Sequence, residues 1–93
     1  MENNLKGQEI IKFVSKNLPN KAGVYQMENE KGEILYIGKA KNLAKRVRNY
    51  TSLKNLTRRL RHMVSMTKKM NFTVTNTEIE ALLLECNLIK RHK

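Results

Sequence analysis

The sequence predicts an α+β fold in which helices flank a small three-stranded antiparallel sheet, in the order αββααβα. Three observations lead to this prediction. Two short runs of β-branched and aromatic residues surround a polar turn, amphipathic segments lie on both sides of this pair, and a later run alternates apolar and polar residues. The chain has 93 residues, which suffice for one modest core, so we expect residues 1–93 to form a single domain.

The chain is expected to begin with a helix and a β-hairpin. Apolar side chains recur at helical spacing over residues 8–16, and Pro19 ends this segment because proline cannot continue a helix. The hairpin strands are expected over residues 24–27 and 34–37, joined by the polar turn of residues 29–32, which ends in a glycine. Such a hairpin places its two strands side by side.

Two triplets in the hairpin each join a tyrosine to a glycine. They are Gly23-Val24-Tyr25 and Tyr36-Ile37-Gly38. If Tyr25 and Tyr36 share one face of the sheet, their phenol groups meet in one small site, beside the basic residues that follow the second triplet. Two phenols next to several cations suggest a site that handles phosphate. The alternative is that both tyrosines are ordinary strand residues, since tyrosine favours strands.

Two helices are expected after the hairpin. The first spans residues 41–50, with apolar side chains at spacing i, i+4 and i+7. Thr51-Ser52 breaks it, and the second helix spans residues 53–66 with one apolar face. The opposite face of this second helix carries the cations Lys54, Arg58 and Arg61.

Arg46 is singled out by its position on the first of these helices. It lies about 60° from the apolar residue Leu43 on a helical wheel, at the edge of the buried face. The planar guanidinium group makes two hydrogen bonds to phosphate oxygens, which suits a scissile phosphate. Lys45 and Arg48 are expected to point toward solvent, and a solvated helix face is the simpler interpretation for both.

A strand and a capped helix complete the predicted fold. Residues 70–75 alternate apolar and polar side chains, as a half-buried strand does. Thr77-Glu78-Ile79-Glu80 is a capping box that opens a helix through Lys90. Helical projection gives this helix two apolar faces, the first formed by Ile79, Leu82, Leu83, Cys86 and Ile89 and the second by Ala81, Leu84 and Leu88.

Glu85 falls between these two apolar faces. A carboxylate at a half-buried position is unfavourable unless a cation, a metal ion or a hydrogen-bond donor satisfies it. The simpler alternative is a side chain that reaches round to solvent or to a neighbouring lysine. The single cysteine, Cys86, excludes an internal disulfide and a zinc site built from several cysteines, and we expect it in the core.

The charge of the chain narrows the class of partner. Nineteen Lys and Arg residues against eight Asp and Glu give a formal net charge of +11. Such a charge opposes compaction unless a polyanion binds, so nucleic acid is the first candidate partner and an anionic membrane surface the second. The longest apolar runs have only four residues, and the N-terminal residues lack the features of a signal peptide. We expect a cytoplasmic protein with no membrane span.

Taken together, the two triplets resemble the two halves of the signature of the GIY-YIG nucleases. Residues 38–50 are similar to the stretch that follows this signature in the UvrC-like members of the family, and residues 85–90 to the closing helix of that domain. The resemblance runs from Leu18 to Lys90 and agrees in order, spacing and residue type. It implies a metal-dependent DNA endonuclease domain that hydrolyses a phosphodiester bond, and it implies the N-terminal domain of a longer chain.

The resemblance also implies roles for individual residues. Glu85 matches the ligand of one divalent metal ion, Mg²⁺ or Mn²⁺, and Tyr25 matches the tyrosine implicated in activating the attacking water. Tyr36 matches the second tyrosine that lines the site, Arg46 the arginine that holds the cleaved phosphodiester, and Lys39 a basic residue beside the second motif. Further contacts to DNA are expected from Lys41, Lys45, Arg48, Lys54, Arg58 and Arg61.

The partners that the resemblance implies belong to nucleotide excision repair. UvrC-like domains make the incision on the 3′ side of a damaged nucleotide after UvrA and UvrB have located the lesion. The expected partners are therefore damaged duplex DNA and, in the full-length context, UvrB and UvrA, with no membrane. We expect the domain itself to be a monomer.

Two other classes of function stay open at this point. A non-catalytic, basic nucleic-acid-binding module explains the net charge and the basic helix face, but it does not explain Glu85 or the paired tyrosines. A structural or docking domain for an acidic partner protein is the second class. Metal-dependent nicking of plasmid DNA separates a nuclease from both.

Overall fold

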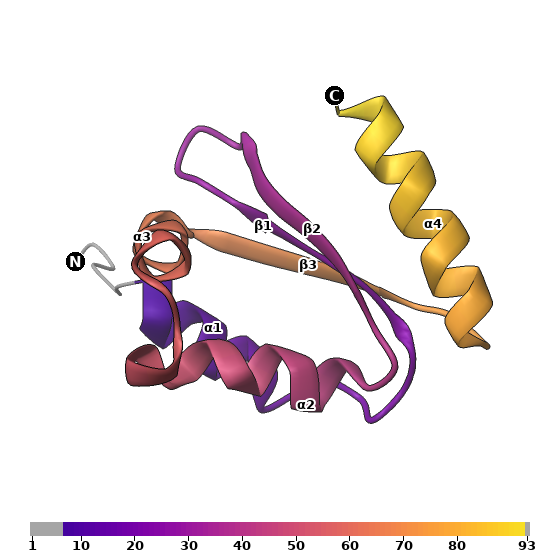
Figure 1. Ribbon diagram of the computed structural model, residues 1–93, viewed down its shortest axis with the longest axis horizontal. Coiled ribbons are helices and arrows are strands. Elements are labelled where there is room, and N and C mark those ends of the chain that lie inside the picture. Colours follow the sequence, from indigo (N-terminus) through magenta and orange to yellow (C-terminus); the bar gives the residue numbers. More distant parts are fainter. Residues whose placement is uncertain (1–6, 93) are drawn as a thin grey trace.

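A three-stranded antiparallel sheet forms the middle layer of the structure, which is a computed structural model that describes residues 7–92 (Figure 1). The strands are β1 (Gly23–Glu28), β2 (Ile34–Ala40) and β3 (Lys69–Val74), in the spatial order β2-β1-β3. Both pairings of the central strand β1 are antiparallel. The predicted fold class and element order are confirmed, and β2 is an edge strand.

Helices cover both faces of this sheet. They are α1 (Gly7–Ser15), α2 (Leu43–Arg48), α3 (Arg58–Met66) and α4 (Glu78–Arg91). Figure 1 shows α4 on one face of the sheet and α1 and α2 on the other. No helix in residues 7–92 is long and apolar enough to cross a membrane. Residues 1–6, on which the expectation about a signal peptide rests, lie outside the described part of the chain.

The hairpin of β1 and β2 has the local chemistry that its turn requires. The Asn29 side-chain oxygen accepts hydrogen bonds from the N–H groups of Lys31 and Glu33, at 2.9 Å each. Gly32 adopts φ of 83°, a left-handed conformation that favours glycine. In the resulting register Tyr25 lies opposite Gly38, which brings the two signature triplets together.

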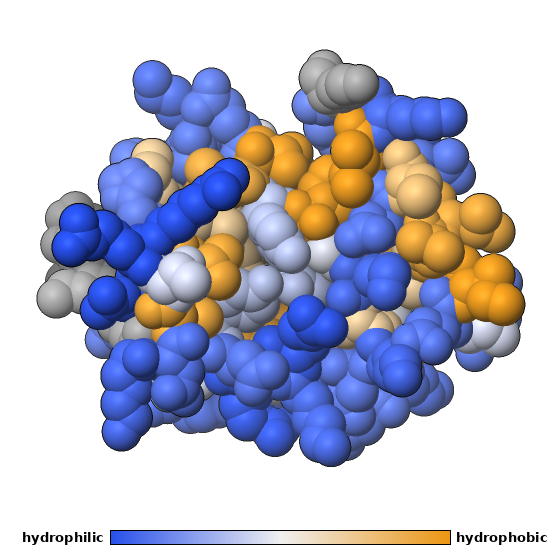
Figure 2. Space-filling model, viewed as in Figure 1, coloured by the Kyte–Doolittle hydropathy of each residue, from blue (hydrophilic) through white to orange (hydrophobic). Residues whose placement is uncertain are grey.

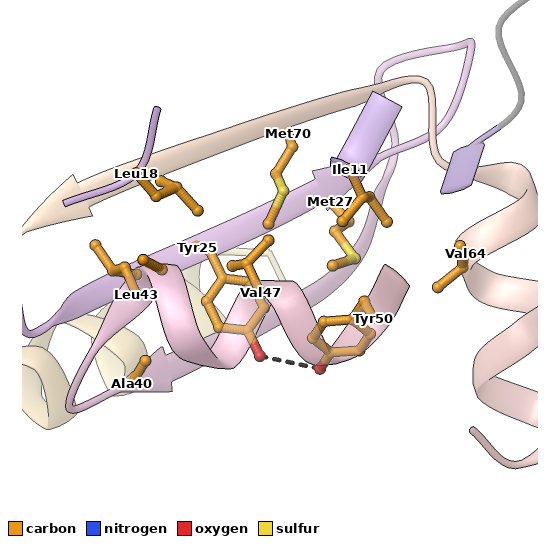
Figure 3. Close-up of a cluster of buried hydrophobic side chains, with 11 residues drawn as sticks. Ile11, Leu18, Tyr25, Met27, Ala40, Leu43, Val47, Tyr50, Val64 and Met70 are labelled. Atoms are coloured by element: carbon orange, nitrogen blue, oxygen red, sulfur yellow. Dashed lines mark hydrogen bonds between the residues drawn. The ribbon is translucent and has the colours of Figure 1, made fainter. Parts of the chain in front are cut away.

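The main hydrophobic core lies between the sheet and the layer of α1 and α2 (Figure 3). Residues on one face of β1 point into it, because side chains of a strand alternate between faces. Tyr25 and Met27 from this face are fully buried, and Leu43 and Val47 of α2 pack against them. The apolar stripe predicted for the helix after the hairpin is thus confirmed as its buried face.

The second and third helices are shorter than predicted because capping residues start each one late. Asn42 caps α2 by accepting a hydrogen bond from a backbone N–H of the first turn, and a 3-10 turn, η1 (Asn49–Thr51), follows the helix. Thr57 caps α3 in the same way. The residues before it form a separate 3-10 turn, η2 (Leu53–Asn55), rather than the start of the predicted helix.

The last helix packs on the sheet with the smaller of its two apolar faces. Ala81 of α4 and Val24 of β1 are both buried, at 0% and 1% exposure, whereas Ile79 is 71% exposed. The predicted capping box of Thr77 and Glu80 is confirmed. The expectation that Cys86 is a core residue is wrong, because Cys86 is exposed. The small Ala81 side chain lets the helix approach the sheet closely, so the broader apolar face of Ile79, Leu82, Leu83, Cys86 and Ile89 is left outside.

Candidate active site

The three tyrosines of the chain pack against one another beneath the hairpin. The ring centroids of Tyr25 and Tyr36 lie 5.9 Å apart, those of Tyr25 and Tyr50 lie 6.0 Å apart, and those of Tyr36 and Tyr50 lie 6.4 Å apart. The hydroxyl groups of Tyr25 and Tyr50 are hydrogen-bonded at 3.0 Å (Figure 3). Tyr25 and Tyr36 therefore share one face of the sheet, as the hairpin predicted.

Gly38 is the residue that lets these rings approach the hairpin backbone. A Cβ atom at this position would lie 2.7 Å from the Cζ and hydroxyl oxygen of Tyr25 and 2.7 Å from Cε2 of Tyr36. Real Cβ atoms do not come this close to other heavy atoms, so any side chain at this position forces the two rings apart. The glycine of the second triplet is thus required by packing between the tyrosines.

We expect Gly38→Ala to destabilise the fold and to disturb the tyrosine cluster. The added methyl group meets two rings in a packed core, and overpacking of this kind costs about 1–3 kcal/mol. Urea denaturation followed by circular dichroism measures this change in the free energy of unfolding. Gly32→Ala is the control that separates the two effects of glycine, because Gly32 has a strained φ but nothing near its Cβ. An unchanged denaturation midpoint for Gly38→Ala contradicts the packing argument.

Burial disfavours ionisation of two of the tyrosine hydroxyls, those of Tyr25 and Tyr50. Burial raises the pKa of Tyr25 far above its ordinary value of 10.0, and the hydrogen bond with Tyr50 raises it further. Burial also raises the pKa of Tyr50, and in both residues the positive charge of Arg46 acts in the opposite direction. Tyr25 and Tyr50 thus form a hydrogen-bonded pair of neutral phenols, with the Arg46 guanidinium as the nearby cation.

A basic cavity of about 580 Å³ opens at the edge strand β2. Because β2 is an edge strand, side chains from both layers of helices meet there: Lys39 comes from β2, Arg46 from α2 and Glu78 from α4. The Lys41 ammonium lies 3.9 Å from the Glu78 carboxylate. The cavity is lined by Lys39, Ala40, Lys41, Asn42, Lys45, Arg46, Arg48, Asn49 and Glu78. Such a concentration of cations is suited to an anionic ligand.

The sequence predicted that Arg46 reaches the site and that Lys45 and Arg48 point away from it into solvent. The structure agrees with this prediction only in part. Lys45 and Arg48 are exposed, as predicted, but Arg46 is exposed as well, so its expected position at the edge of the buried face is not observed. All three residues line the same cavity. Arg46 differs from the other two in one respect, because its charge acts on the hydroxyls of Tyr25 and Tyr50.

Glu85 lies on the side of α4 that faces the edge strand. It is half-buried, as its position between two apolar faces predicted. Residues seven apart lie on nearly the same side of a helix. Glu78, seven residues before Glu85, lines the basic cavity, and His92, seven residues after it, lines a groove beside Tyr36. Glu85 is therefore placed between the basic cavity and Tyr36.

A divalent metal ion at this position would have one carboxylate ligand from the chain. Seven helical residues separate Glu78 from Glu85 by roughly 10 Å along the axis, too far for both to bind one ion. No group of three or more His, Cys, Asp and Glu side chains gathers anywhere in the described part of the chain. A single half-buried carboxylate fits Mg²⁺, which prefers oxygen ligands and retains several waters.

The remaining cations predicted to bind DNA lie away from this cavity. Lys54 is in η2, and Arg58 and Arg61 are in α3; all three are exposed and none lines the basic cavity. Figure 2 shows hydrophilic side chains over the lower part of the molecule, where Figure 1 places α2. The basic surface is therefore broader than the candidate site itself.

Two residues near the site were missed by the sequence prediction. Tyr50 was predicted only as part of the apolar stripe of the helix, but its hydroxyl group is hydrogen-bonded to the hydroxyl of Tyr25. Its position four residues after Arg46, on the same side of that predicted helix, could have indicated a place in the site. Arg59 was not singled out, but it lines a separate cavity beside Tyr36. The direction in which each arginine of α3 points depends on where the helix begins, which the turn η2 and the Thr57 cap determine. The local sequence therefore does not distinguish Arg59 from Arg58 and Arg61.

The antiparallel α+β scaffold brings cations and buried phenols to one sheet edge, an arrangement suited to a protein that binds and cleaves a phosphodiester, and comparison with known proteins agrees. The family model of the UvrC-like GIY-YIG domain matches residues 21–93. The chain belongs to this family of endonuclease domains.

Known relatives of the chain are UvrC proteins. UvrABC system protein C of Bartonella henselae is 53% identical over 90 residues, which are 97% of this chain and 14% of the relative. The same protein of Rhizobium meliloti is 55% identical over 87 residues, which are 94% of this chain and 13% of the relative. The chain thus spans about one seventh of the length of these curated relatives.

The fold also matches a solved endonuclease domain. The GIY-YIG N-terminal endonuclease domain of UvrC from Thermotoga maritima, bound to its catalytic divalent cation magnesium, is 35% identical with a TM-score of 0.79. The match covers 88% of this chain and 89% of that one. A variant of that domain with one tyrosine replaced by phenylalanine gives the same TM-score.

Proposed function

We propose that this chain hydrolyses a phosphodiester bond of damaged duplex DNA with the help of one divalent metal ion. One observation supports this proposal above all: Arg46, Lys39 and the tyrosine cluster lie together at the edge strand β2. Glu85 lies on the side of α4 that faces this edge. Because the relatives are UvrC proteins, the proposed reaction is the 3′-side incision of nucleotide excision repair, with UvrA and UvrB as partners in the longer protein.

Glu85 is the proposed metal ligand. When bound there, Mg²⁺ or Mn²⁺ supplies Lewis-acid stabilisation of the charge that develops on the phosphate and the leaving oxygen. The half-buried carboxylate of Glu85 would hold the cation beside the basic cavity, where Arg46 would contact the same phosphate. This placement also gives a reason for a carboxylate between two apolar faces, where it would otherwise be unfavourable.

Arg46 and Lys39 are the proposed phosphate-binding residues. Both line the basic cavity, and Arg46 lies close enough to Tyr25 and Tyr50 to act on their hydroxyls electrostatically. The guanidinium fork binds two phosphate oxygens, which orients the phosphorus centre toward the phenols. Lys41, Lys45 and Arg48 add positive charge at the rim of the cavity and bind neighbouring phosphates.

We assign different roles to the three phenols. One of them contacts the attacking water, and the other two hold that tyrosine ring in position. Tyr25 is fully buried and Tyr50 is 6% exposed, whereas Tyr36 is partly exposed and lines two grooves. The resemblance assigned the activation of water to Tyr25, but Tyr25 is fully buried and Tyr36 is not, so we revise that expectation and infer that Tyr36 contacts the attacking water. Tyr25 and Tyr50, joined by their hydrogen bond, hold the Tyr36 ring and the Arg46 side chain in place.

Removing the Tyr36 hydroxyl is expected to cost more activity than removing that of Tyr25. Tyr36→Phe deletes the accessible phenol and should lower the single-turnover rate about 100-fold, a usual loss for proton-transfer or water-orienting groups. Tyr25→Phe should lower it less, while removing the bond to Tyr50 costs ~1 kcal/mol of unfolding free energy. Rapid-quench cleavage at saturating metal measures both variants. A larger loss for Tyr25→Phe contradicts the burial argument.

The decisive experiment is cleavage itself. The purified chain is incubated with plasmid DNA in Mg²⁺, in Mn²⁺ and in EDTA, and with a damaged duplex in the presence and absence of UvrA and UvrB. Nicking that requires the metal supports the proposal, and stimulation by UvrA and UvrB on the 3′ side supports the repair role. DNA binding without cleavage under every condition refutes catalysis and favours a non-catalytic nucleic-acid-binding module.

A further inference from the structure

A second cavity of about 340 Å³ lies beside the tyrosine cluster, between β2 and α3. Leu35 and Tyr36 of β2 form one wall, and Leu60 and Met63 of α3 form the other. Thr57 and Arg59 complete the lining at the start of α3. This cavity is distinct from the basic cavity, since no residue lines both. Its volume falls in the range of small-ligand sites, about 300–1,000 Å³.

The chemistry of this cavity differs from that of the basic one. Its walls are aliphatic and aromatic, and Arg59 is its one charged lining residue. Arg59 is exposed and has no ion-pair partner among residues 7–92, so its guanidinium is available to an anion. An apolar cavity with one exposed arginine in its lining matches a nucleotide, whose base has an apolar face and whose phosphate is an anion.

The position of the cavity links it to the candidate site. Tyr36 belongs to both the tyrosine cluster and the cavity wall, with its ring centroid 6.4 Å from that of Tyr50. Arg46 lines the basic cavity and acts electrostatically on the hydroxyls of Tyr25 and Tyr50. Both cavities therefore adjoin the tyrosine cluster, which suits one strand whose base enters the apolar cavity and whose scissile phosphate enters the basic one.

We propose that this cavity is a nucleotide subsite that binds the base next to the scissile phosphate, with Arg59 on the adjoining phosphate. The inference rests on the proposed nuclease function and adds to it a binding site for one base of the substrate. The base stacks out of the duplex against Tyr36, Leu60 and Met63, and the cost of unstacking is lowest at a weakened or damaged pair. The subsite therefore favours distorted DNA over intact duplex.

The test uses thymidine 3′,5′-bisphosphate as the probe and does not depend on cleavage. The isotope-labelled chain is titrated with the probe while the Met63 methyl and Arg59 side-chain NMR signals are followed. We expect both signals to shift. Arg59→Ala should weaken binding about 10- to 100-fold, as loss of a charge-assisted hydrogen bond does. Arg59→Lys should weaken it less, and the matched control Arg91→Ala, an exposed arginine on α4, should leave it unchanged.

A second probe, 2-deoxyribose 3,5-bisphosphate, lacks the base and distinguishes a nucleotide from a simple anion. We expect it to shift the Met63 methyl signal much less than the thymidine probe. Equal shifts with both probes, shifts confined to the basic cavity, or no Met63 shift at millimolar probe each overturn the subsite. None of these results affects the nuclease function, which fails only if metal-dependent plasmid nicking is absent.

Discussion

Glu85→Gln is expected to abolish Mg²⁺-dependent cleavage while leaving the fold intact. The substitution keeps the size of the side chain and removes its negative charge, so a divalent cation would lose the carboxylate ligand that we propose for it. We expect a loss of at least about 1,000-fold in the single-turnover rate, since a metal ion stabilises the transition state by several kcal/mol. A neutral amide is easier to half-bury than a carboxylate, so stability should not fall.

The matched control for Glu85 is Glu78→Gln on the same helix. Glu78 lies two turns away, lines the basic cavity and contacts Lys41 at 3.9 Å, so it shares the charge and the helix but not the proposed ligand role. We expect it to retain metal-dependent cleavage with a modest change in rate. Isothermal titration with Mn²⁺ provides an independent measure of metal binding. Parental cleavage by Glu85→Gln would show that Glu85 is not the ligand.

The hairpin shows how much of the site the sequence specified. Strand alternation and a glycine-ended turn predicted the hairpin and allowed Tyr25 and Tyr36 to share one face, but the register that decides this comes from the structure. The register of Tyr25 opposite Gly38 also explains the second glycine, since two rings pack where its side chain would be. The sequence thus predicted the hairpin that carries Tyr25, Tyr36 and Gly38.

The helices show where sequence reasoning was insufficient. The last helix has two apolar faces, and no local rule states which one meets the sheet. The answer depends on tertiary packing, which buries Ala81 and leaves Ile79 exposed. Cys86 was misplaced for this reason. Likewise, the turns η1 and η2 orient Tyr50 and Arg59, and such short turns follow from side-chain caps and tertiary contacts rather than from periodicity.

The apolar face left outside on α4 is a consequence of that packing. Ile79 is 71% exposed and Leu83 is 59% exposed, and Figure 2 shows apolar side chains gathered on the right of the view, over α4. Glu85 owes its half-buried position to the same geometry, because it sits at the boundary between the buried and exposed faces. The prediction that Glu85 is half-buried was therefore correct, although the prediction of the buried face of α4 was wrong.

Arg46→Ala is expected to lower turnover strongly, whereas Arg48→Ala should mainly weaken DNA binding. Both arginines line the basic cavity, but only Arg46 acts on the hydroxyls of Tyr25 and Tyr50. Loss of one preorganised donor to the developing charge costs about 100- to 1,000-fold in rate. Loss of a phosphate contact without such a role reduces the salt dependence of binding by about one unit of slope.

The comparison of the two variants depends on separating binding from turnover. Single-turnover rates at saturating DNA report the chemical step, and fluorescence anisotropy across a salt series reports affinity. Because both substitutions remove the same charge from exposed positions of one helix, non-specific effects on folding and solubility should be equal. Arg46→Lys adds a further test, since an ammonium keeps the charge but lacks the two-donor fork, and it should recover only part of the rate. Equal losses of turnover in Arg46→Ala and Arg48→Ala would mean that the cavity acts through its total charge, and that contact with the tyrosine cluster gives Arg46 no distinct role.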